Sequence, residues 1–202
     1  MIGKLPTIID NRDENTATER LGGVPTLIGE TGIPFDLQKK KAYRSGNFKA
    51  QVRAIERSLQ AMDAALLNYT IWNYTADNTN RRGDGWNDED FSIFSRDQQN
   101  DPGDINSGGR ALEALLRPYA RLTAGEPLRM HFDLRTKIFA FEFRHNPQVA
   151  APTEFFIPNF QYPHGCRVQV SDGIYQIDRS NQLLTYQHAA GQDIHKIVVK
   201  PV

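Results

Sequence analysis

The 202-residue sequence lacks several features that would each assign it to a broad class of protein. It contains one cysteine, Cys166, so no disulfide can form within the chain. Its 24 basic and 24 acidic side chains cancel, and this neutral balance argues against a nucleic-acid partner. No apolar run approaches membrane-spanning length, and no secretory leader follows Met1. We therefore expect a soluble, cytoplasmic protein, and secretion stays open if a further segment precedes Met1.

The composition is that of a folded globular chain. Hydrophobic residues make up 39% of the sequence and aromatic residues 10%, which is enough to build a core. The length allows one large domain or two small ones. Beyond Gly125 and Pro127 the sequence changes from long helical and polar stretches to short strand-like runs. We therefore predict two domains, residues 1–125 and 126–202.

The most informative stretch is an apolar segment from Val24 to Ile28 that leads to Gly29, Glu30 and Gly32. An apolar strand of this kind is typical of a parallel sheet in which both faces are buried. In barrels of parallel strands, residues at the carboxyl ends of the strands carry the chemistry. Glu30 therefore lies where an active-site carboxylate would lie. A glutamate that only pairs with an arginine fits the same position.

The segments on either side of this strand differ in character. Residues 1–20 are polar and are expected to form a loop with at most one helical turn. Residues 36–46 are rich in lysine and are interpreted as a polar loop. From residue 47 to 67 the apolar positions recur every three or four residues, which predicts one amphipathic helix.

A second strand, residues 68–74, is predicted directly after this helix and carries Trp72 near its end. Strand, helix and strand in this order predict two parallel strands, so Trp72 is expected at the same edge as Glu30. An indole beside a carboxylate suits a sugar, because the ring can stack on the sugar while the carboxylate reacts. A core aromatic residue is the alternative interpretation of Trp72.

The next segment, residues 77–106, is long, polar and rich in acidic side chains. Its spacing does not match the calcium-binding EF-hand loop, so we expect neither a metal site nor a cofactor. A loop of this length is expected to be functional or to be ordered by its own packing, with Phe91, Ile93 and Phe94 as apolar anchors. A second helix is predicted over residues 109–122, with Pro118 ending its regular part.

The C-terminal region alternates short apolar runs with turn signals such as Asp172-Gly173 and Ser180-Asn181. About seven short strands in this arrangement predict an antiparallel β-sandwich. The expected strands are Leu128–Phe132, Ile138–Phe143, Thr153–Ile157, Cys166–Val170, Ile174–Ile177, Gln182–Tyr186 and Ile194–Val199.

Taken together, these pieces resemble the C-terminal part of glycoside hydrolase family five, in the branch of endoglycoceramidases, glucosylceramidases and steryl-glucosidases. The resemblance covers the chain from about Leu21 onward, and its motifs are specific only in combination. The matching pieces are Pro25-Thr26-Leu27-Ile28-Gly29-Glu30, Trp72-Asn73-Tyr74 with Gly83-Asp84-Gly85-Trp86-Asn87-Asp88-Glu89-Asp90, Arg110-Ala111-Leu112 with Arg117-Pro118-Tyr119, and Thr153-Glu154-Phe155-Phe156-Ile157-Pro158.

This resemblance implies an α+β composite: the last two βα units of a (β/α)8 barrel followed by an antiparallel β-sandwich. It implies a retaining β-glycosidase that uses two glutamates, with Glu30 as the nucleophile at the end of the seventh strand. Trp72 then corresponds to the aromatic residue that lines the sugar subsite after the eighth strand. The implied substrate-binding residues are Trp72, Asn73, Asp84, Trp86 and Asn87.

The sequence departs from the family in one central respect. The acid/base glutamate of the family belongs to an Asn-Glu pair on the fourth strand, and neither Glu14 nor Glu19 matches it. A retaining mechanism needs two carboxyl groups, so we expect the isolated chain to be incomplete and inactive. The partner would be the missing N-terminal part of the barrel or a second copy of this chain.

Two classes of function remain open on the sequence. The first is the C-terminal portion of a β-glycosidase that hydrolyses β-glucosides of lipid aglycones such as glucosylceramide or steryl glucoside. The chain would then be a truncation, a proteolytic piece or half of a split enzyme. The second is a non-catalytic carbohydrate- or lipid-binding module built on the β-sandwich.

Overall fold

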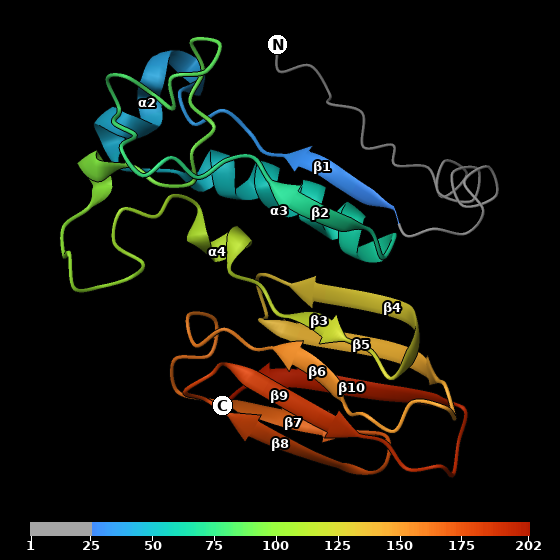
Figure 1. Cartoon of the computed structure of the whole chain (residues 1–202). Helices are drawn as coiled ribbons and strands as arrows, with labels where there is room; N and C mark the ends of the chain where they lie inside the picture. The colour runs from blue at the N-terminus through green and yellow to red at the C-terminus, as the bar shows by residue number, and fades with distance from the viewer. Residues whose placement is uncertain (1–25) are drawn as a thin grey trace. The chain divides into compact units, whose positions relative to one another are not determined.

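A computed structural model describes residues 26–202, which form two compact units divided after Leu115 (Figure 1). Each unit is treated by itself. The interpretation of residues 1–20 as a loop concerns residues outside the described range. The expected boundary after residue 125 falls at the start of β4 (Gly125–Asp133), whereas the first strand of the second unit is β3 (Tyr119–Leu122).

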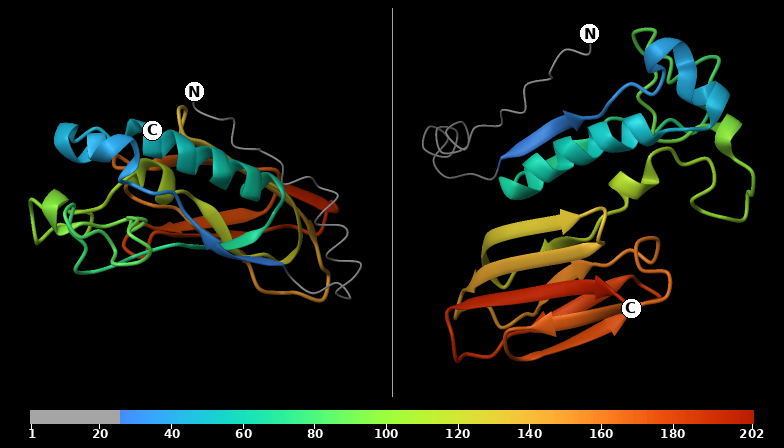
Figure 2. Two further views of the ribbon diagram at one scale, coloured as in Figure 1. Left: turned by 90° about the horizontal axis from the view of Figure 1, so that it is seen from above. Right: turned by 180° about the vertical axis from the view of Figure 1, so that it is seen from behind.

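The first unit is built on two parallel strands, β1 (Leu27–Thr31) and β2 (Asn68–Ile71), which pair from Leu27↔Asn68 to Thr31↔Ile71. The connection includes α3 (Lys49–Ala64), which lies along one face of the pair (Figures 1 and 2). The predicted strand, helix and parallel strand are confirmed. Burial of β1 on both faces is not found, because Leu27 is 59% exposed and β1 pairs only with β2 among the described residues.

The lysine-rich segment after β1 differs from its interpretation as a loop. It contains α2 (Leu37–Ser45), whose residues Gln38, Lys39 and Lys40 have left-handed rather than helical dihedral angles. Lysine, glutamine and alanine favour helix, but the segment has no apolar period to reveal it. None of the helices within residues 26–202 is both long and apolar enough to cross a membrane.

A long loop follows β2 and contains only a 3₁₀ turn, η1 (Arg96–Gln98), before the short helix α4 (Leu112–Leu115). One buried side chain, Arg110, organises this loop. Its guanidinium forms an ion pair of 2.8 Å with Asp90, and both side chains are almost fully buried. All five of its N–H donors are used, with acceptors on Asp90, Ser92, Asn78, Asn80 and Gln98.

Aromatic and polar neighbours complete this buried ion pair. The guanidinium lies 5.3 Å from the ring centre of Phe35 and 4.9 Å from that of Tyr43. Tyr43 donates a hydrogen bond of 2.5 Å to Asp90, and burial together with this bond raises the pKa of the Tyr43 phenol. The loop is therefore ordered, but its principal anchor is Arg110, which lies outside residues 77–106, and not the expected apolar residues Phe91, Ile93 and Phe94.

The second unit is a sandwich of two antiparallel four-stranded sheets, as the sequence predicted (Figure 2). One sheet has the order β4-β5-β10-β7 and the other β3-β6-β9-β8. The remaining strands are β5 (Ile138–His145), β6 (Thr153–Phe156), β7 (Cys166–Val170), β8 (Ile174–Asp178), β9 (Leu183–Gln187) and β10 (Ile194–Pro201).

The core of the sandwich follows from the two-residue period of its strands. On β5, Phe139, Phe141 and Phe143 point inward and are buried. Phe155 of the opposite sheet packs edge-on against Phe139 and Phe141, with ring centres 5.9 and 5.3 Å apart. Such aromatic pairs stabilise a core beyond the area that they bury.

The predicted helix over residues 109–122 is largely wrong, although its regular part was expected to end at Pro118. Only Leu112–Leu115 are helical, and Tyr119–Leu122 form β3, which pairs with β6. Pro118 cannot donate the backbone hydrogen bond that a continuing helix would need. The residues after it instead pair with β6, which lies far away in the sequence, and the pairing begins at Tyr119↔Phe156.

We expect Arg110→Met to destabilise the first unit by about 3–5 kcal/mol, because the substitution leaves the Asp90 carboxylate buried and unpaired. Both tryptophans of the chain, Trp72 and Trp86, lie in this unit. Urea unfolding followed by tryptophan fluorescence therefore reports on the unit that contains Arg110.

The matched control is Arg82→Met in the same loop. Arg82 is 72% exposed and pairs with Asp77 at 3.4 Å, so its removal should change the free energy of unfolding by less than about 1 kcal/mol. Equal urea midpoints for the two variants would show that the buried ion pair does not organise the loop.

Candidate functional site

Glu30 is the penultimate residue of β1 and is exposed to solvent. Its neighbour Thr31 is buried, and the Thr31 hydroxyl contacts the sulfur of Met62 on α3 at 3.8 Å. Because successive side chains of a strand point to opposite faces, Glu30 lies on the face of β1 that α3 does not cover. The carboxylate is thus available at the carboxyl end of the strand.

Trp72 follows β2 directly, and its backbone N–H donates to the carbonyl of Thr31 at 2.9 Å. The ends of the two strands are in close contact here, since a Cβ on Gly32 would lie 1.9 Å from the Trp72 carbonyl oxygen. Only glycine fits this position. The parallel pairing therefore brings Glu30 and Trp72 to the same edge of the two-stranded sheet, and the Trp72–Asn73 peptide bond is cis.

Asn73 and Asp84, two further predicted site residues, bind one another. The amide of Asn73 donates to Asp84 at 2.8 Å, and the same carboxylate accepts from the backbone N–H groups of Trp86 and Phe91. Both Asp84 oxygens are therefore engaged in holding the loop to the end of β2. This arrangement orients the neighbouring side chains, and direct contact of Asp84 with a substrate stays a prediction.

Trp86 and Asn87 lie in a tight turn at the surface of the loop. Trp86 is 60% exposed, and its ring meets the Trp72 ring edge-on at a centre-to-centre distance of 6.4 Å. Asn87 is exposed and adopts left-handed dihedral angles, which asparagine tolerates better than most residues. Two indoles and one carboxylate are thus presented near one strand edge, in an arrangement that can bind the apolar face of a sugar.

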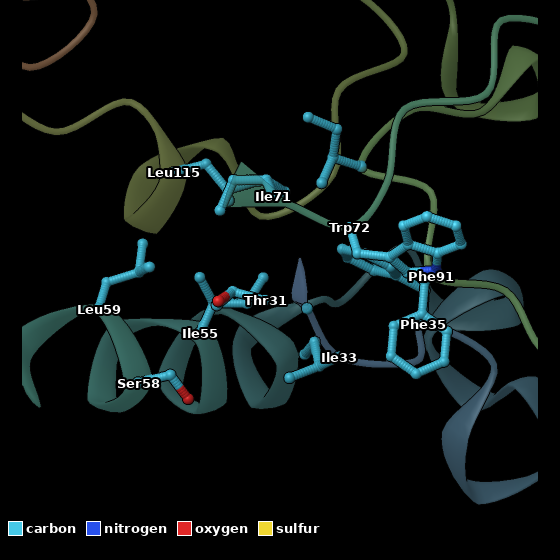
Figure 3. A pocket seen from close by; sticks show the side chains of 12 residues that line it. Thr31, Ile33, Phe35, Ile55, Ser58, Leu59, Ile71, Trp72, Phe91 and Leu115 are labelled. Carbon is cyan, nitrogen blue, oxygen red and sulfur yellow. The ribbon is translucent and has the colours of Figure 1, made fainter. Parts of the chain in front are cut away.

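A narrow cavity lies between β1, β2, α3 and the loop (Figure 3). It is lined mainly by apolar side chains, among them Ile55, Leu59, Ile71 and Trp72, and its volume is about 10 Å³. This is room for about one water molecule, so the cavity is part of the packing under the site and cannot hold a sugar.

Sequence reasoning missed the role of Arg110 and Asp90, which order the loop that carries Asp84, Trp86 and Asn87. The arginine was noticed only as part of a family motif. The sequence offers no clear signal of this role, because the segment after Arg110 also contains the charged residues Glu113 and Arg117.

Comparison with known proteins agrees with this architecture. Residues 117–199 match the glycoside hydrolase family 5 C-terminal domain. A glucosylceramidase of Rhizopus delemar is 33% identical over 192 residues, which cover 88% of this chain and 28% of that protein. The crystal structure of Cryptococcus neoformans sterylglucosidase 1 superimposes with a TM-score of 0.84 at 32% identity, over 94% of this chain and 30% of that one.

A more distant structure, endo-glycoceramidase II from Rhodococcus sp., shares the fold with a TM-score of 0.66 at 19% identity. It is matched over 95% of this chain and 36% of its own length. The chain therefore spans about three-tenths of the length of the relatives that it matches. Residues 117–199 form a glycoside hydrolase family 5 C-terminal domain, and most of the chain is similar to part of a glucosylceramidase and of a sterylglucosidase.

Proposed function

We propose that this chain is the C-terminal portion of a retaining β-glycosidase and that Glu30 is its nucleophile. In this account β1 and β2 are the last two strands of a (β/α)8 barrel. The observation that carries the proposal is the parallel pairing of β1 with β2, which puts Glu30 and Trp72 at the carboxyl ends of adjacent strands. That edge is where barrel enzymes hold their catalytic side chains.

Glu30 attacks the anomeric carbon of the glucoside through a carboxylate oxygen and forms a covalent glycosyl ester. The bond to the aglycone oxygen breaks, and a second carboxylic acid about 5–5.5 Å from Glu30 protonates that oxygen as it leaves. The same second group then removes a proton from water, which opens the ester and regenerates Glu30. Trp72 and Trp86 hold the sugar by stacking, while Asn73 and Asp84 keep the loop in place.

The second carboxyl group comes from outside the described residues. In our proposal it is supplied by the missing N-terminal part of the barrel, whether on the same polypeptide or on another chain. Barrel closure also requires this part, because β1 and β2 have no other strand partners within residues 26–202. The exposed Leu27 and the uncovered face of β1 would then be buried by the neighbouring strands.

The substrate that we propose is a β-glucoside with a lipid aglycone. The names of the relatives support this class, since they are a glucosylceramidase, an ergosteryl-beta-glucosidase and a sterylglucosidase. A ceramide and a sterol are both bulky and apolar, so the glucose is the common element that Glu30 and the tryptophans would recognise.

The deciding experiment compares aryl β-glucoside hydrolysis by three samples. These are the lone chain, the chain combined with the N-terminal part of the Rhizopus delemar relative or with its own upstream segment, and the same pair carrying Glu30→Gln. We expect turnover only in the unmodified pair, and a loss of at least about 1,000-fold with Glu30→Gln, because an amide cannot act as the nucleophile.

Glu89→Gln in the pair is the matched control. Glu89 is an exposed carboxylate of the same unit, so this variant should retain the turnover of the parent. Robust hydrolysis by the lone chain would show that the second carboxyl group is not missing. Full turnover by the Glu30→Gln pair would instead show that Glu30 is not the nucleophile.

A cavity in the sandwich favours a second candidate function, a non-catalytic lipid- or carbohydrate-binding module. The cavity has a volume of about 380 Å³ and is lined by apolar residues such as Ile157, Tyr162 and Ile177 together with Arg179. Volumes of about 300–1,000 Å³ are typical of small-molecule sites. A pocket that combines apolar side chains with the charged residues Asp178 and Arg179 suits a lipid that carries a polar head.

If the cavity binds glycolipid, Ile177→Asp should reduce co-sedimentation of the chain with glucosylceramide-containing vesicles by at least about 10-fold, since it places a charge where the lipid would contact the lining. Ile174→Asp is the control, because Ile174 lies on the same strand, is 66% exposed and does not line the cavity. Equal co-sedimentation of the two variants would exclude the cavity as the binding site.

A further inference from the structure

Three histidines from distant parts of the sequence gather at one end of the β-sandwich. His145 is the last residue of β5, His188 follows β9 and His195 lies in β10. Each offers one ring nitrogen, and these three atoms all lie within 4.8 Å of one another. Because β5 and β10 belong to one sheet and β9 to the other, the cluster bridges the two sheets.

The spacing of the rings suits a shared metal ion. His145 Nδ1 lies 3.0 Å from His195 Nε2, and the three ring centres are 4.5 to 5.1 Å apart. A tetrahedral Zn²⁺ with Zn–N bonds of about 2.0–2.1 Å separates its ligand nitrogens by about 3.4 Å. Small rotations of the three rings would therefore bring their nitrogens to one ion.

Asp172 contacts the second ring nitrogen of His195, the one that does not face His145. The Nδ1 atom of His195 lies 3.0 Å from the Asp172 carboxylate, and the Tyr186 hydroxyl also donates to Asp172. With its Nδ1 proton held by Asp172, His195 turns the lone pair of Nε2 toward the cluster. A carboxylate behind a ligand histidine is the usual outer partner of a metal-bound imidazole.

His188 supplies an independent observation. Its Nδ1 atom is buried and has no hydrogen-bond partner in the structure of residues 26–202. The His188 ring also packs against those of His195 and His145, with ring centres 4.5 and 4.9 Å apart. A buried polar atom without a partner is uncommon in folded proteins and calls for an explanation such as an ion.

We propose that His145, His188 and His195 bind one divalent transition-metal ion, with Zn²⁺ as the best fit. Three imidazole ligands favour Zn²⁺, Cu²⁺ or Ni²⁺ over Ca²⁺ and Mg²⁺, which prefer oxygen ligands. His145 and His188 are half-buried, so solvent can fill the fourth position. The role of the ion is structural, because it ties the two sheets together at one end of the sandwich. This site is independent of Glu30 and of the proposed glycosidase activity.

Sequence reasoning expected no metal site, and the reason is the spacing. The three histidines do not form a short ligand motif. The pairing of β5 with β10, which sets His195 opposite Phe143, and the packing of the two sheets bring them together. The register of distant strands is not visible in a single sequence.

The test uses the 202-residue chain without a histidine tag, stripped of metal with a chelator and dialysed against Zn²⁺. We expect about one Zn²⁺ per chain by elemental analysis and a higher melting temperature with Zn²⁺ than without it. We also expect a tetrahedral visible spectrum with Co²⁺. His188→Gln and His145→Gln should each weaken Zn²⁺ affinity more than about 100-fold, and Asp172→Asn about 10–100-fold.

The control is His131→Gln, because His131 is exposed on β4 and lies outside the cluster, so this variant should bind Zn²⁺ like the parent. The melting temperature of each metal-free variant shows whether it folds. If either His188→Gln or His145→Gln fails to fold, the Zn²⁺ affinity of the other variant tests the proposal. The proposal would be overturned if the parent chain retained no Zn²⁺. It would also be overturned if a folded His188→Gln or His145→Gln variant bound Zn²⁺ with unchanged affinity.

Discussion

The parallel pairing of β1 with β2 is the constraint on which the proposed site depends. Parallel strands have their carboxyl ends at the same edge, so Glu30 and Trp72 both lie at that edge. The helix α3 covers one face and leaves Glu30 on the other. The same pairing leaves two outer strand edges without partners among the described residues, and this is the physical reason for proposing a larger barrel.

A buried ion pair then fixes the loop that extends this edge. Arg110 uses every one of its donors to hold Asp90 and the loop around it, while Asp84 ties the Trp86 turn to Asn73. Binding residues that sit on a loop are precise only when such contacts lock the loop. The long polar segment therefore works as a rigid extension of the strand edge, with Trp86 presented at its surface.

The local sequence pattern was enough to predict most of the secondary structure. The alternation of Phe139, Phe141 and Phe143 revealed β5, and the three-to-four period of Ile55, Leu59 and Met62 revealed α3. Two features that depend on specific distant partners were not predicted. Residues after Pro118 join β6 instead of extending a helix, and the histidine cluster arises only when the two sheets meet. The residues of the proposed site were predicted from motifs that resemble a family. The buried ion pair of Arg110 with Asp90 was not predicted.

The central claim, that Glu30 is the nucleophile, is tested most directly by trapping its ester. A 2-deoxy-2-fluoroglucoside with a good leaving group forms the glycosyl-enzyme but releases it slowly. The reconstituted enzyme would be incubated with this compound. Its intact mass would then be measured by mass spectrometry, and the labelled residue would be located by peptide digestion. The account predicts one added fluoroglucosyl group, attached at Glu30. A label on any other residue, or turnover of ordinary substrate without any labelling of this chain, would contradict it.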